Sequence, residues 1–142
     1  MNTNYNLTLL QQALSAHQQG NLALARKLYQ AVLTKEPANF DCLHMLGVIC
    51  LTENQLGEAQ QYLAQAIAIH QSDAGAFKNL GLVMQAQGKF REALAYFEAA
   101  LSLNTRYAEA FSNKALTLQE LGELDKAIAA LEQAIALMPE HA

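Results

Sequence analysis

Residues 74–107 read AGAFKNLGLVMQAQGKFREALAYFEAALSLNTRY, and this stretch decides the fold because its pattern recurs along the chain. One position of the pattern holds an alanine every 34 residues, namely Ala25, Ala59, Ala93 and Ala127. Another holds residues that tolerate a positive φ angle, namely Gly20, Asn54, Gly88 and Gly122. A self-similar period of this length indicates a stacked array of small structural units.

Each unit contains two stretches with the period of an α-helix. In residues 74–107 the first stretch, AGAFKNLGLVMQAQ, carries one apolar stripe: Phe77, Leu80, Gly81 and Met84. The second, KFREALAYFEAAL, has an apolar inner face: Phe90, Ala93, Phe97, Ala100 and Leu101. We expect Gly88 to end the first helix in a left-handed conformation. The sequence therefore predicts one all-α domain, residues 1–142, with helix pairs at residues 6–39, 40–73, 74–107 and 108–141.

Small residues recur where two antiparallel helices must approach each other closely. They include the alanines of the repeat and three residues of the first helices: Gly47, Gly81 and Ala115. Pro37 and Pro139 are expected to end second helices, because proline cannot continue a helix. Asp73 is expected to cap the helix that follows it.

The composition is that of a folded protein without a strong charge. The chain has 142 residues, of which 52% are hydrophobic and 15% charged, and its formal net charge is −4. This charge argues against nucleic acids and anionic membranes as partners. Because no run reaches the roughly 20 apolar residues that span a bilayer and no secretion signal is evident, we expect a cytoplasmic protein.

These residues together resemble the tetratricopeptide repeat family. The likeness covers nearly the whole chain and is strongest in residues 74–107, whereas in the first unit Gln12 and Ala13 replace the usual Leu-Gly pair. The resemblance implies a right-handed superhelix (solenoid) of four helix-turn-helix hairpins. It also implies that first helices line a concave groove that binds proteins or peptides.

A second stripe on each first helix, offset from the hairpin core, is expected to face this groove. The predicted peptide-binding residues are His44, Met45, Val48, Lys78, Asn79, Leu82, Gln85, Asn113 and Leu116. Asn79 and Asn113 lie one period apart, and their amides can both donate to and accept from a peptide backbone. They resemble the asparagine ladder of O-linked N-acetylglucosamine transferases. The alternative is that they bond to neighbouring helices.

Apolar residues of the same stripe allow two interpretations. Leu14, Val48, Leu82 and Leu116 could form a groove floor, but contact between neighbouring first helices is the interpretation that we favour. Leu7, Leu10 and Met45 would mark an interaction patch if they were exposed together.

No motif points to catalysis, a metal or another cofactor. The histidines His17, His44, His70 and His141 lack the spacing of metal ligands. Cys42 and Cys50 are expected to be reduced, half-buried thiols, and the tyrosines are expected in the core.

The last helix raises the prospect of self-association. Ile128 and Ile135 would be covered by a further unit in an ordinary array, so another copy of the chain or the continuation of a longer protein would have to cover them. Lys114 stands where other units have Leu46 and Leu80, which we interpret as a relaxed core position.

Three hypotheses follow. The leading one is a non-enzymatic protein-interaction module that binds an extended or helical peptide, with Lys78 meeting an acidic group of the partner. The second is a homo-oligomeric scaffold assembled through terminal helix faces. The third is the targeting region of a larger enzyme such as a glycosyltransferase.

Overall fold

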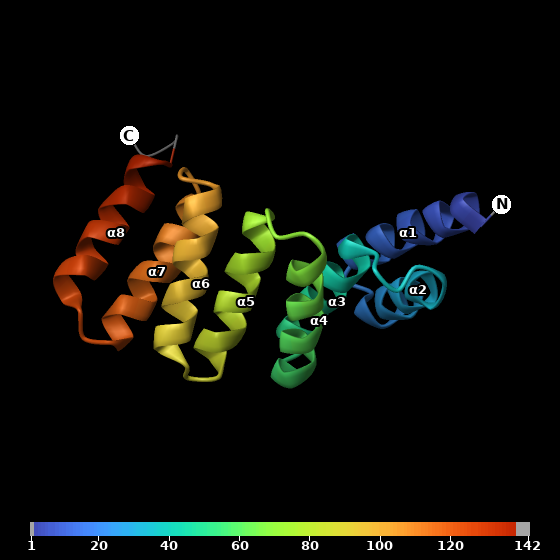
Figure 1. The fold of residues 1–142 in the computed structure, drawn as a ribbon, viewed down its shortest axis with the longest axis horizontal. Helices are drawn as coiled ribbons and strands as arrows, with labels where there is room; N and C mark the ends of the chain where they lie inside the picture. Colours follow the sequence, from blue (N-terminus) through green and yellow to red (C-terminus); the bar gives the residue numbers. More distant parts are fainter. Residues whose placement is uncertain (1, 139–142) are drawn as a thin grey trace. The chain divides into compact units, whose positions relative to one another are not determined.

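The computed structural model describes residues 2–138, which form eight α-helices and no strand (Figure 1). In chain order the helices are α1 (Asn2–Gln18), α2 (Leu22–Lys35), α3 (Phe40–Thr52), α4 (Leu56–Ile69), α5 (Ala74–Ala86), α6 (Phe90–Leu103), α7 (Ala108–Glu120) and α8 (Leu124–Ala136). The all-α class and the four helix hairpins of a solenoid are confirmed. Pro139 and His141 lie outside the described residues.

The chain divides into two compact units, residues 1–70 with α1 to α4 and residues 71–142 with α5 to α8. Within the first unit α1 packs on α2, α2 on α3, and α3 on α4. The second unit repeats this order from α5 to α8 and adds a contact between α5 and α7. Each unit therefore consists of two stacked hairpins.

The turn inside each hairpin depends on one residue with a positive φ angle. The angles are 79° at Gly20, 60° at Asn54, 77° at Gly88 and 78° at Gly122, as the sequence predicts. The N–H of Gly88 donates to the Gln85 carbonyl at 3.0 Å, and the next N–H donates to the Met84 carbonyl at 2.9 Å. These bonds satisfy carbonyls that the end of a helix leaves free, so the same turn is made in all four hairpins.

Helix starts in three places have side-chain caps. The carboxylate of Asp73 accepts from the Ala76 N–H at 2.9 Å, which confirms its predicted role. Asn21 and Asn39 accept in the same way at the starts of α2 and α3. Pro37 follows the end of α2 at Lys35, as expected for a residue that cannot continue a helix.

The cores of the second and third hairpins form where a glycine meets a large side chain. A Cβ atom on Gly47 would lie 2.5 Å from the Leu63 side chain, and one on Gly81 would lie 2.6 Å from the Phe97 ring. Leu63 and Phe97 are fully buried, at roughly 1.5–3 kcal/mol of stabilisation each. The predicted close approach of the paired helices is confirmed.

Two expectations about single residues were wrong. Tyr5 is 56% exposed rather than buried, and the Lys35 ammonium lies 5.0 Å from the centre of its ring. Tyr29, in contrast, is fully buried. Cys42 and Cys50 are completely rather than half buried and are not joined by a disulfide.

Candidate functional site

The predicted binding residues lie on the first helices of three hairpins. His44, Met45 and Val48 are on α3 of the first unit. The other six lie in the second unit, where α5 and α7 contact each other. We define the α5/α7 face by eight residues: Lys78, Asn79, Leu82, Gln85, Glu109, Ser112, Asn113 and Leu116. Their spacing of three, four and seven residues places them on one side of each helix.

An ion pair joins the two helices of the α5/α7 face. The Lys78 Nζ lies 2.8 Å from the Glu109 Oε1, and the Lys78 side chain is only 12% exposed. The same ammonium lies 5.9 Å from the centre of the Tyr107 ring. Lys78 thus has an acidic partner within the chain, a contact that the sequence alone did not predict although both residues are in the expected stripe.

Asn113 carries an unused hydrogen-bond donor. Its Nδ2 is buried, yet it has no hydrogen-bond partner among the described residues. Its backbone carbonyl accepts from the Thr117 hydroxyl at 2.9 Å. A buried donor without an acceptor costs roughly 1–3 kcal/mol, so a rotation of the side chain that brings the amide to an acceptor on an incoming ligand would be favoured.

Apolar residues of the predicted stripe are more exposed than we expected. Leu116 is 52% exposed and Leu14 is 46% exposed, so burial against a neighbouring first helix does not account for them. Val48 and Leu82 are partly buried. Leu116 therefore offers an apolar contact next to the unused donor of Asn113.

Leu7, Leu10 and Met45 of the first unit are not exposed together, so they do not form the interaction patch that their joint exposure would have marked. Leu7 is 52% exposed, but Leu10 and Met45 pack against the core of that unit. The His44 ring lies 5.5 Å from the Phe40 ring, centre to centre. The α3 residues thus form a partly buried surface rather than an exposed apolar one.

A second feature is a charged pocket between α6 and the last hairpin, with a volume of about 540 Å³. It is lined by Arg91, Leu94, Glu98, Lys114, Leu118, Glu123, Lys126, Ala129, Ala130 and Gln133. Lys114 lies 3.6 Å from Glu98, and Arg91 lies 3.2 Å from Glu123. The charges in the pocket are therefore largely paired with one another.

The sequence contained a signal for this pocket. Lys114 stands where the second and third hairpins have leucine, and Ala130 stands one period after Tyr96 and two after Tyr62. Loss of a tyrosine ring and of a leucine leaves space between the helices. The lysine alone indicates a relaxed core position, and only the two substitutions together indicate a pocket.

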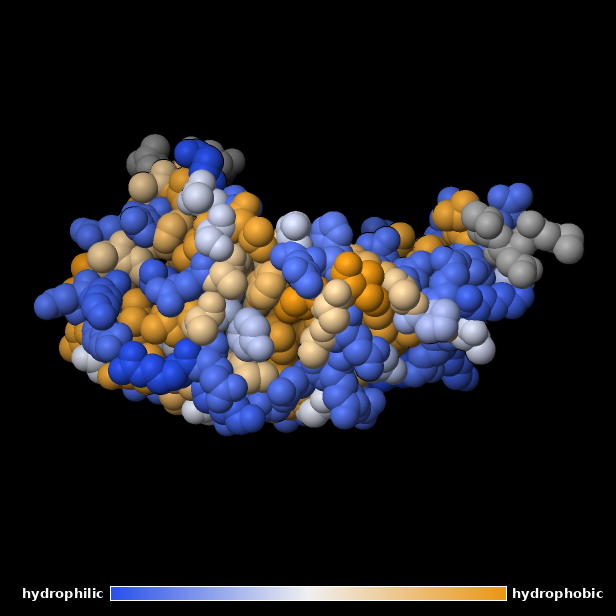
Figure 2. Space-filling model, viewed as in Figure 1, coloured by the Kyte–Doolittle hydropathy of each residue, from blue (hydrophilic) through white to orange (hydrophobic). Residues whose placement is uncertain are grey.

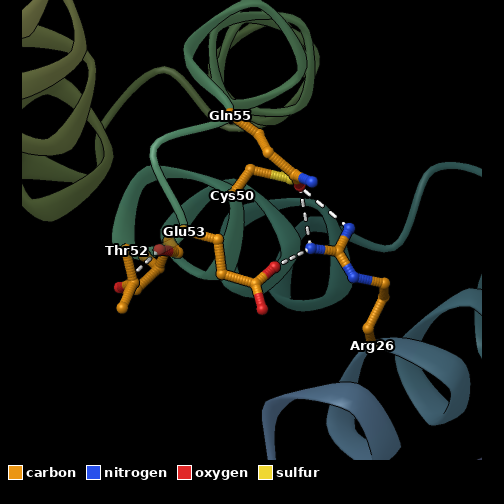
Figure 3. Close-up of polar contacts among 6 residues, drawn as sticks. Arg26, Cys50, Thr52, Glu53 and Gln55 are labelled. Atoms are coloured by element: carbon orange, nitrogen blue, oxygen red, sulfur yellow. Dashed lines mark hydrogen bonds and ion pairs between the residues drawn. The ribbon is translucent and has the colours of Figure 1, made fainter.

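The equivalent place in the first unit is filled by polar contacts around Arg26 (Figure 3). The guanidinium of Arg26 bonds to the Glu53 carboxylate, donates to Gln55 Oε1 at 3.0 Å and donates to Cys50 Sγ at 3.6 Å. Arg26 is on α2 and its partners are at and after the end of α3, so this cluster fastens the two hairpins together.

The thiols do not have the properties of nucleophiles. Burial raises the pKa of Cys42 from 9.0 to about 12, and it also raises the pKa of Cys50. A reactive cysteine needs the opposite shift. Among residues 2–138 no three His, Cys, Asp or Glu side chains are grouped so that they could hold a metal ion. Nor is any helix in this range long and apolar enough to cross a membrane.

Several solved structures resemble the chain. The crystal structure of MamA is 28% identical and matches with a TM-score of 0.81 over 88% of this chain and 73% of that one. YrrB, described as a TPR protein with an unusual peptide-binding site, is 26% identical with a TM-score of 0.80, over 91% of this chain and 66% of that one. A mutant of the Thermobaculum terrenum O-GlcNAc transferase is 28% identical with a TM-score of 0.78, over 82% of this chain and 22% of that one.

Two sequence families also match, and both are described as tetratricopeptide repeat. One match covers residues 16–80 and the other covers residues 73–140. A search among curated proteins gave no match. The four hairpins with their 34-residue period and the two family matches lead to one conclusion: the chain belongs to the tetratricopeptide repeat family.

Proposed function

We propose that this protein is a non-catalytic interaction module that binds a peptide segment of a partner protein on its α5/α7 face. Membership of the tetratricopeptide repeat family supports a protein-interaction role. The more specific proposal depends mainly on one observation, the buried Nδ2 of Asn113 that lacks an acceptor among the residues described.

A peptide backbone would supply the missing acceptor. Each residue of an extended peptide carries a carbonyl that needs a donor once water is removed from it. The Asn113 amide would donate to such a carbonyl. Asn79 lies one period earlier, on α5. It would contact the peptide backbone at a point about one helix-to-helix distance from the Asn113 contact.

Apolar side chains beside the asparagines would give the contact area. Leu116 is 52% exposed, and Leu82 is partly exposed. Both lie one turn after an asparagine of the face, at positions 113 and 79. We therefore assign backbone binding to the amides and the binding of apolar peptide side chains to the leucines.

Lys78 takes a different role from the one expected from the sequence. Its ammonium is held by Glu109 and lies near the Tyr107 ring. We propose that the pair keeps α5 and α7 at the spacing that the peptide needs. The Gln85 amide is a further contact of the same face, and His44, Met45 and Val48 remain a separate prediction for the first unit.

The comparison with YrrB supports a peptide ligand, since that protein is described as having a peptide-binding site. This chain covers 22% of the length of the O-GlcNAc transferase that it resembles. The third hypothesis, that the chain is the targeting region of a larger enzyme, therefore stays a proposal.

The experiment begins with a displayed library of random dodecapeptides, panned on the whole chain. Enriched peptides are then synthesised with a fluorophore, and their affinities are measured by anisotropy. We expect Asn113→Ala and Leu116→Asp each to weaken binding about tenfold, because each removes roughly 1.4 kcal/mol. Leu103→Asp is the control, since that residue is 43% exposed at the end of α6 and away from the face.

The proposal fails if panning yields no peptide that binds, or if the enriched peptides bind the two face variants as tightly as the control. Circular dichroism of all three variants checks that the helices are intact. All three substituted residues are outside the buried core, so folding should be retained.

A further inference from the structure

An apolar stripe runs along the outer side of α8. Leu124, Ile128, Leu131 and Ile135 are 58%, 55%, 44% and 44% exposed. Their spacing of four, three and four residues places them on one side of the helix. In Figure 2 apolar residues are visible among polar ones over the part of the second unit that α8 occupies. An uncovered stripe of this kind marks a contact surface.

The structure itself contains the covered form of this stripe. One period earlier, on α6, the equivalent of Ile128 is Leu94, which packs against Ala115, Leu118, Ala127 and Ala130 of the last hairpin. The equivalent of Ile135 is Leu101, which is only 9% exposed and belongs to a cluster with Ala110. At these two positions α6 therefore packs on the next hairpin of the same chain.

The first hairpin has an exposed surface on which such a stripe could pack. A surface groove of about 300 Å³ lies along α1 and α2, lined by Gln12, Ser15, Ala16, Gln19, Leu24 and Leu28. Four of these residues stand three periods before residues that face α6 in the charged pocket. They are Gln12, Ala16, Leu24 and Leu28, and their equivalents are Lys114, Leu118, Lys126 and Ala130. On the first hairpin this groove is thus the counterpart of the surface that faces α6 across the charged pocket of the last hairpin.

We propose that α8 of one copy occupies the α1/α2 groove of a second copy, in the register in which α6 packs on the last hairpin. Ile128 would then pack near Ala16 and Leu28, which stand three periods before Leu118 and Ala130 of the cluster that Leu94 packs against. Ile135 would meet Tyr5, which is 56% exposed and stands three periods before Tyr107 of the cluster around Leu101. One contact would thus cover Ile128 and Ile135 of α8 together with Tyr5 of α1.

The charges fit this register. Glu98 pairs with Lys114 at 3.6 Å, and their equivalents in the proposed contact are Glu132 and Gln12, a carboxylate and an amide that can donate to it. Arg91 pairs with Glu123 at 3.2 Å, and the equivalents there are Asp125 and Asn21. In neither pair do like charges oppose each other. Because the two surfaces differ, the contact is head-to-tail, and it can extend into chains of copies.

The test uses variants that each block one surface. Ile128→Asp with Ile135→Asp blocks α8. Gln12→Glu with Leu24→Asp blocks the groove, since a carboxylate at position 12 would oppose Glu132. Ile69→Asp with Leu103→Asp is the control, because it adds the same two charges at exposed residues at the ends of α4 and α6, outside both surfaces and outside the α5/α7 face. Light scattering after size exclusion gives the mass of each from about 10 µM to about 1 mM.

We expect the wild type and the control to grow in mass with concentration, and each blocked variant to stay monomeric. A mixture of the two blocked variants should form a one-to-one dimer, because each supplies the surface that the other lacks. Gln12→Lys should tighten the wild-type association about two- to fivefold by restoring the charge of Lys114.

Three results would overturn the proposal: a wild type that is monomeric throughout, a groove-blocked variant that dimerises alone through α8, or a mixture that stays monomeric. Hydrogen exchange of the wild type at the two concentrations is independent of any variant. Slower exchange at the higher concentration is expected in α1, α2 and α8 together, and slower exchange in α8 alone would contradict the register.

Discussion

Phe97 of α6 packs directly on Gly81 of α5, so closely that a Cβ atom on the glycine would lie 2.6 Å from the ring. We therefore expect Gly81→Ala to lower the free energy of unfolding by about 1–3 kcal/mol, because the helices must move apart or the ring must leave its rotamer. Urea unfolding followed by circular dichroism measures the change.

Gly57 supplies a matched control for this prediction. It lies in α4, and a methyl group added to it would have no atom within 4 Å. Gly57→Ala should raise the free energy of unfolding by about 0.5–1 kcal/mol, since alanine loses less backbone entropy in a helix. Equal effects of the two substitutions would show that close packing does not distinguish the sites.

Asn54 adopts a φ angle of 60° in a turn where the other three hairpins have glycine. Asn54→Gly should leave stability within a few tenths of a kcal/mol, whereas Asn54→Ala should cost about 1 kcal/mol because the left-handed region strains a Cβ atom. The midpoint of urea unfolding tests this. If Asn54→Ala leaves the midpoint of urea unfolding unchanged, the turn is not held in this conformation in solution.

Alkaline pH should destabilise the first unit. Burial raises the pKa of Cys42 from 9.0 to about 12 and the pKa of Tyr29 from 10.0 to about 12. The folded state holds these protons after the unfolded chain has released them. Stability is therefore unaffected below about pH 9, falls above it because of Cys42, and falls more steeply above about pH 10 because of Tyr29, with each group approaching a slope of about 1.4 kcal/mol per pH unit.

Cys42→Ala isolates the contribution of the thiol. Its free energy of unfolding, measured from about pH 8 to about pH 10 by urea titration, should fall less steeply with pH than that of the wild type. Parallel slopes for the two proteins would contradict a buried, neutral Cys42.

Filling the charged pocket between α6 and the last hairpin should stabilise the protein. Lys114→Leu with Ala130→Tyr restores the residue types that the second and third hairpins have, and it should raise the free energy of unfolding by about 0.5–2 kcal/mol by filling space. The lost pair with Glu98 should matter little, because Glu98 is 55% exposed. Thermal unfolding checks the direction, and a lower midpoint would mean that the pocket cannot hold the ring.

The fold was predictable because period, small residues and turns all agree along the sequence. Gly47 and Gly81 in the pairing positions, and Asn54 in the turn position, each impose a local geometry that needs no knowledge of distant contacts. The asparagine cap and the aspartate cap of the first helices followed the same local rules.

The site was less predictable because it depends on contacts between helices. The pairing of Lys78 with Glu109 requires the rotation of α5 relative to α7, which a repeat pattern does not give. The exposure of Leu116 likewise depends on what neighbouring helices leave uncovered. The sequence pattern places these residues on one stripe of their helices, but it does not give their partners.

The proposed peptide site is tested most directly by the side-chain amide signals of the protein when an enriched peptide is added. We predict that the NMR signal of the Asn113 amide group and the methyl signals of Leu82 and Leu116 shift in a saturable way with the peptide concentration. Saturable shifts confined to α1, α2 or α8, with the Asn113 signal unchanged, would contradict binding at the α5/α7 face.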